Sequence, residues 1–142
     1  MNRSLIFLSF TLIFIFSCTS ISEDKLDLLN GYWEIETVEF PNGGKKEYKM
    51  NTDIEFIQLD GLKGFRKKMK PRFDGSYETS DDAEPFELIS NEKVFSLHYK
   101  NDLSEWKETL TSLTADNFTV KNEDGILYHY KRFEPINIES TP

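Results

Sequence analysis

The chain has 142 residues and 14% aromatic residues, enough for one domain with one hydrophobic core. Its formal charge is −8, and an excess of acidic groups repels phosphate backbones, which argues against nucleic acid as a partner. Cys18 is the single cysteine, so the chain has no intramolecular disulfide and its packing has to supply the stability.

The first seventeen residues have the layout of a signal peptide. A short basic start, Met1–Arg3, precedes an apolar run without charge, Leu5–Phe16, and the small Ser17 stands before Cys18. The apolar run is about 12 residues long, whereas a membrane-spanning helix needs roughly 20. We therefore predict a cleaved signal peptide at residues 1–17 and no permanent transmembrane span.

The residues around the cysteine, Ile15-Phe16-Ser17-Cys18, resemble the lipobox of bacterial lipoproteins. The resemblance implies diacylglycerol on the Cys18 sulfur and an acyl chain such as palmitate on the new amino group. One acyl chain binds a membrane only marginally, while two or three hold a protein firmly. The alternative is ordinary secretion with a free thiol at Cys18.

Residues 18–24 begin with small and polar side chains. We therefore predict that this segment is a flexible tether that carries the lipidated Cys18. The acidic pair Glu23-Asp24 weakly resembles the export signals of some outer-membrane lipoproteins. The resulting expectation is a protein of the bacterial cell envelope, anchored to a membrane, with the outer membrane favoured.

The remaining chain is expected to be all-β. Asp24–Leu29 can form one helical turn with leucines on one side, and Asn30-Gly31 ends it. Runs of apolar and aromatic residues separated by turn residues then predict strands. The expected strands are Tyr32–Phe40, Lys45–Met50, Ile54–Leu59, Gly64–Phe73, Ser76–Thr79, Phe86–Ser90, Lys93–Tyr99, Glu105–Leu113, Phe118–Lys121 and Ile126–Phe133.

Sequential hairpins of this kind favour an up-and-down antiparallel β-barrel of about eight strands over a sandwich, because closure removes exposed sheet edges. The barrel domain is expected to cover residues 25–134, followed by a polar tail at 135–142.

Two short motifs at the ends of this domain resemble the lipocalin family. Gly31-Tyr32-Trp33 opens the first strand after a leucine-bearing turn, and Lys131-Arg132-Phe133 closes the last one. The resemblance implies that the helical turn plugs the barrel floor and that Arg132 packs on Trp33. A guanidinium over an indole contributes roughly 0.5–2 kcal/mol. Gly31, Trp33 and Arg132 are thus expected to have a structural role.

The sequence offers little for catalysis. The two histidines, His98 and His129, alternate with tyrosines on predicted strands, and no nucleophile elbow, zinc-protease motif or phosphate loop is present. We therefore predict a protein that is not an enzyme and that needs no metal or cofactor.

A basic segment stands out on the predicted strand Gly64–Phe73. Alternation along this strand places Lys67 on the same face as Phe65 and Met69, toward the interior. Two partners are possible for Lys67 there, an anionic group of a ligand or the carboxylate of Glu108. The other basic residues, Arg66, Lys68 and Lys70, are expected outside, and all of these positive charges could instead balance neighbouring acidic strands.

Two functions from different classes remain open. The first is a lipid-anchored barrel that holds a small hydrophobic or anionic amphipathic molecule. The second is a filled barrel with a structural or protein-interaction role; a void below roughly 300 Å³ would favour it. The candidate ligand-binding residues are Phe56, Phe65, Lys67, Met69, Phe95, Tyr99, Trp106, Glu108, Tyr128 and Tyr130.

Overall fold

A computed structural model describes residues 20–79 and 82–135. The predicted signal peptide, Cys18 and the tail from residue 136 lie outside the described residues. One 3₁₀-helix, η1 (Glu23–Leu29), precedes the strands. The strands are β1 (Gly31–Glu39), β2 (Lys45–Glu47), β3 (Ile54–Asp60), β4 (Lys63–Pro71), β5 (Tyr77–Thr79), β6 (Glu84–Asn91), β7 (Val94–Lys100), β8 (Glu105–Leu113), β9 (Asn117–Asn122) and β10 (Leu127–Arg132).

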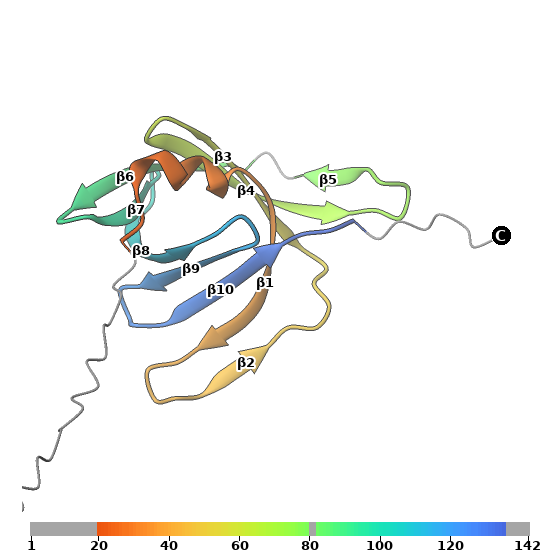
Figure 1. The fold of residues 1–142 in the computed structure, drawn as a ribbon. Coiled ribbons are helices and arrows are strands. Elements are labelled where there is room, and N and C mark those ends of the chain that lie inside the picture. The colour runs from red at the N-terminus through yellow and green to blue at the C-terminus, as the bar shows by residue number, and fades with distance from the viewer. Residues whose placement is uncertain (1–19, 80–81, 136–142) are drawn as a thin grey trace, which may run out of the picture.

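Eight of these strands close into an antiparallel barrel, which confirms the predicted fold class (Figure 1). They follow the order β1, β3, β4, β6, β7, β8, β9, β10, and β10 pairs with β1 to complete the ring. The short strands β2 and β5 pair with β1 and β4 and extend from the barrel as two arms. The described residues thus contain the closed barrel together with its own hydrophobic core, as is typical of an independently folding domain.

The turns explain how so short a chain forms so many strands. Gly61 and Gly75 adopt φ values of 62° and 81° in the turns after β3 and β4. These backbone angles are costly for residues with a Cβ, and tight hairpins require them.

Helix η1 closes one end of the barrel, which we call the floor. Leu26 and Leu29 insert into the core, and both are buried. Glu23 and Asp24 belong to η1, so the expectation that they form part of the flexible tether is wrong. The opposite end, the mouth, holds the turns at 101–104 and 123–126. In the described part of the chain no helix is long and apolar enough to cross a membrane.

A second apolar cluster lies on the outside of the barrel and is made of Tyr32, Phe56, Phe65 and Tyr77. The ring of Tyr77 on β5 stacks on Tyr32 of β1 at 4.8 Å, and Tyr32 lies 4.9 Å from Phe56. Phe56 contacts Phe65 at 6.0 Å. Strands β3 and β4 therefore carry apolar side chains on both faces.

Candidate functional site

The floor of the barrel is fixed by two residues from opposite ends of the domain. The guanidinium carbon of Arg132 lies 3.7 Å from the centre of the Trp33 ring. The predicted contact between these two residues is therefore confirmed. Arg132 also donates to the carbonyls of Asn30 at 2.6 Å and Leu28 at 2.9 Å. The Trp33 indole donates to the Leu29 carbonyl at 2.8 Å. These bonds satisfy carbonyls at the end of η1 and hold it against the barrel.

Gly31 has to be a glycine at this point. Its φ is 121°, and a Cβ would lie 2.6 Å from a guanidinium nitrogen of Arg132. Any side chain would displace Arg132 from the floor.

An aromatic column fills the barrel from the floor to its middle. Phe118 meets Trp33 edge-on at 4.7 Å and stacks on Tyr130 at 4.6 Å. The guanidinium carbon of Arg66 lies 5.1 Å from the centre of the Tyr130 ring. Phe118 was absent from the sequence-based candidates, although it lies directly opposite Tyr130 in the β9–β10 register.

Arg66 is the centre of a polar cluster inside the barrel, which also contains Glu55, Tyr99, Glu108 and Tyr130. Its Nη2 donates to the Tyr130 hydroxyl at 2.6 Å and its Nη1 to the Tyr99 hydroxyl at 3.2 Å. Its Nε donates to Glu55 at 3.1 Å, and Nη1 also approaches Glu108 at 3.4 Å. Strands β3, β4, β7, β8 and β10 each contribute one of these residues.

Burial governs the electrostatics of this polar cluster. The Arg66 side chain is 9% exposed, against 18% for Glu55 and 14% for Glu108. Burial raises the pKa of Glu108, although Arg66 pulls it down. Burial also raises the pKa values of Tyr99 and Tyr130, so both phenols stay neutral and can hydrogen-bond. Burial alone would lower the pKa of Arg66, but the surrounding phenols and carboxylates hold it well above its ordinary value.

The orientation predicted for β4 is wrong. In the β3–β4 register Arg66 lies opposite Ile57, which faces the core, while Lys67 lies opposite Phe56 on the outside. Phe65, Lys67, Met69 and Phe56 therefore point away from the interior, and Glu108 pairs with Arg66 instead of Lys67. The prediction failed because Phe65 and Phe56 join the outer cluster, so apolar alternation did not identify the inner face.

The other aromatic candidates lie inside the barrel. Phe95, Tyr99 and Tyr130 are buried in the core, and Tyr128 and Trp106 pack against it while still half-buried. Trp106 stacks on Tyr99 at 5.0 Å with nearly parallel rings. Tyr99 and Tyr130 are thus buried, whereas Trp106 and Tyr128, nearer the mouth, retain access to solvent.

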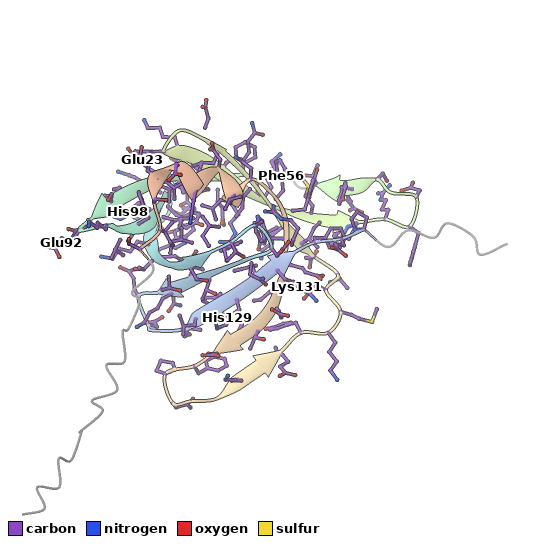
Figure 2. All side chains as sticks on the ribbon, viewed as in Figure 1. Glu23, Phe56, Glu92, His98, His129 and Lys131 are labelled. Atoms are coloured by element: carbon purple, nitrogen blue, oxygen red, sulfur yellow. The ribbon has the colours of Figure 1, made fainter. Side chains whose placement is uncertain are left out.

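Neither histidine belongs to this interior. His98 lies between Glu87 and Lys107 on neighbouring strands and borders a surface hollow of about 340 Å³. His129 contacts the Thr119 hydroxyl at 2.9 Å, and the two histidines lie well apart (Figure 2). Within residues 20–79 and 82–135, no group of three or more histidine, cysteine or acidic side chains is arranged to hold a metal ion.

Comparisons with known proteins gave three similar folds. No protein-family model and no curated protein matches the sequence. The chain is similar to the solved structure of a lipocalin-like protein from Bacteroides uniformis, with 11% identity, a TM-score of 0.47 and coverage of 75% of this chain and 99% of that one.

An uncharacterized protein from Bacteroides eggerthii is similar at 13% identity and a TM-score of 0.47, covering 74% of this chain and 99% of that one. Apocrustacyanin C1 is similar at 14% identity and a TM-score of 0.42, covering 86% of this chain and 74% of that one. The barrel architecture itself rests on the strand pairing of this chain.

Proposed function

We propose that this barrel is a binding protein without catalytic activity, and that it holds a small amphipathic molecule at its mouth. The observation behind this proposal is the polar cluster around Arg66. Removing three charged groups from water costs free energy of folding. Well-packed apolar residues of similar volume often give a core that is equally stable or more stable. Clusters with such perturbed ionisation are typical of binding and active sites.

The ligand would lie between this cluster and the solvent. Ile35, Trp106 and Tyr128 pack on the core from the mouth side and remain half-buried, which gives an apolar rim above the charges. The cluster has two carboxylates, Glu55 and Glu108, against one guanidinium. Its surplus of negative charge favours an ammonium or hydroxyl group on the ligand over a carboxylate.

Titration of residues 20–142 with octylammonium, octanol and octanoate tests this proposal through tryptophan fluorescence and calorimetry. We expect octylammonium to bind most tightly and octanoate least. Glu108→Gln should reduce the preference for the ammonium, and Trp106→Leu should weaken all binding. Lys67→Met serves as the matched control, because Lys67 faces outward, and should bind like the native chain.

A filled barrel with a protein-interaction role is the second candidate, and the packed aromatic column from Trp33 to Tyr130 favours it. If none of the three probes binds, or if Trp106→Leu leaves binding unchanged, the ligand proposal fails and this alternative stands.

We also propose that Cys18 is acylated and holds the barrel at a membrane of the bacterial envelope, with the outer membrane favoured. The support is the lipobox resemblance and the short distance in sequence between Cys18 and η1. Expression with a clickable palmitate analogue should label the native chain and leave Cys18→Ser unlabelled. A native chain that takes no label and stays in the aqueous phase of a detergent extraction would contradict the anchor.

A further inference from the structure

Two loops on one side of the barrel carry apolar side chains that project into solvent. Met50, in the loop between β2 and β3, and Phe73, in the turn between β4 and β5, are each 90% exposed. Both loops lie on the right of the barrel in Figure 1, away from the β6–β7 hairpin. Leu103, in the turn at 101–104, is exposed to the same degree, at 95%, so exposure alone does not identify a partner and the charges around Met50 and Phe73 have to be considered.

The surroundings of these two residues are basic. Lys49 precedes Met50, while Lys68, Lys70 and Arg72 precede Phe73, and all four side chains are exposed. Residues 45–53 and 67–79 contain seven of the 17 lysines and arginines but four of the 25 acidic residues. The arms are therefore positive on a protein that is otherwise strongly negative.

The two arms also share a surface hollow of about 280 Å³. Asp53 lines it from the loop that holds Met50, and Lys68, Lys70, Glu78 and Thr79 line it from the β4–β5 hairpin. Two ammonium groups and two carboxylates thus border the hollow, and Glu78 also pairs with Arg72 at 3.2 Å. We call the cations and apolar side chains of these two loops the basic arm surface and define it by Lys49, Met50, Lys68, Lys70, Arg72 and Phe73.

We propose that the basic arm surface docks on an anionic phospholipid membrane. Lipid headgroups supply phosphates for the cations, and the boundary with the acyl chains accepts exposed phenylalanine and methionine side chains. The acidic remainder of the barrel weakens this attraction little, since charges farther than about 10 Å from the lipid are screened at physiological salt. Neither the ligand site nor the Cys18 anchor is needed for this docking.

Sedimentation of residues 20–142 with vesicles tests the proposal, because this segment contains the whole barrel. Vesicles of phosphatidylcholine are compared with vesicles that also contain phosphatidylglycerol. We expect binding to the second kind, weakened by added salt. The triple variant Lys68→Gln, Lys70→Gln, Arg72→Gln should lower the partition coefficient about tenfold or more, and Phe73→Ser should lower it severalfold.

The matched control is Lys25→Gln, Lys63→Gln, Lys107→Gln, which removes three exposed cations elsewhere on the barrel. It should partition like the native chain, and urea denaturation establishes that all variants are folded. Equal binding by the two triple variants would overturn the proposal. So would the absence of binding to phosphatidylglycerol vesicles, or binding to an acidic protein without binding to these vesicles.

Discussion

At the scale of single residues, Arg66 connects the members of the polar cluster inside the barrel. It bonds two carboxylates and two phenols from four other strands, so it is the partner that all four groups share. Removing one member of a buried ion pair leaves a charge without compensation, which is far more costly than replacing the whole pair.

Arg66→Met is therefore expected to destabilise the barrel by about 3–5 kcal/mol near neutral pH. Two half-buried carboxylates, Glu55 and Glu108, would then be left without their cation. Urea denaturation followed by tryptophan fluorescence measures the loss. Lys68→Met, on the same strand but exposed, should cost less than about 1 kcal/mol. Equal effects from the two variants would show that Arg66 contributes no more than a surface residue.

Glu108 gives the cluster a pH dependence with a definite sign. Its pKa in the folded state is raised by burial, so the folded protein binds this proton more tightly than the unfolded chain does. The stability that protonation provides is complete below the unfolded pKa and is lost as the pH rises through the folded pKa. Native protein should thus lose stability relative to Glu108→Gln as the pH rises from below the ordinary glutamate pKa toward neutrality.

Urea denaturation of both proteins over this pH range checks the prediction for Glu108. The difference between the two free energies of unfolding cancels the titration of carboxylates that they share. The raised pKa of Glu108 would be contradicted if this difference in unfolding free energy were constant with pH. It would also be contradicted if the difference shifted in favour of the native protein as the pH rises.

At the scale of elements, η1 and the β4–β5 hairpin show how local segments complete the barrel. Helix η1 has seven residues, too few to be stable alone, and it is held by buried leucines and by bonds to Arg132 and Trp33. The hairpin is attached to the outside of the barrel where Tyr77 of β5 stacks on Tyr32 of β1. Both elements derive their structure from tertiary packing.

Leu29→Ala should accordingly destabilise the whole barrel by about 2–5 kcal/mol, because Leu29 is fully buried in the floor. Leu28→Ala, half-buried on the same helix, should cost clearly less. Chemical denaturation measures both variants. If they unfold alike, η1 is a loosely attached segment and does not close the floor.

At the scale of the whole molecule, packing differs between the two ends of the barrel. The floor half contains a continuous aromatic column, while half-buried side chains and two arms surround the mouth. Binding regions are commonly drawn from the less stable parts of a protein, where few buried contacts resist opening.

Amide hydrogen exchange should follow this gradient. Phe118 and Val120, in β9 and fully buried, are expected to exchange near the rate set by global unfolding. The amides of β2 and β5 should exchange orders of magnitude faster, since both strands belong to the exposed arms. Nuclear magnetic resonance can follow each amide, and uniform protection across barrel and arms would contradict this gradient.

The sequence by itself determined the features that depend on local pattern. Glycine-containing turns between apolar runs predicted the strands and their sequential pairing, and the family resemblance carried by Gly31, Trp33 and Arg132 implied the floor. These features need only the neighbours along the chain or a short motif. The signal peptide and lipid anchor are also predicted by a local motif, and they remain proposals.

Only the tertiary structure decided which face of β4 is inside. Phe65 and Phe56 contact each other on the outer face, where Tyr32 and Tyr77 extend the apolar cluster, while the β3–β4 register turns Arg66 inward. The polar cluster then forms from five strands that are distant in sequence. No local pattern encodes it, because the burial and partners of each group depend on where the other strands lie.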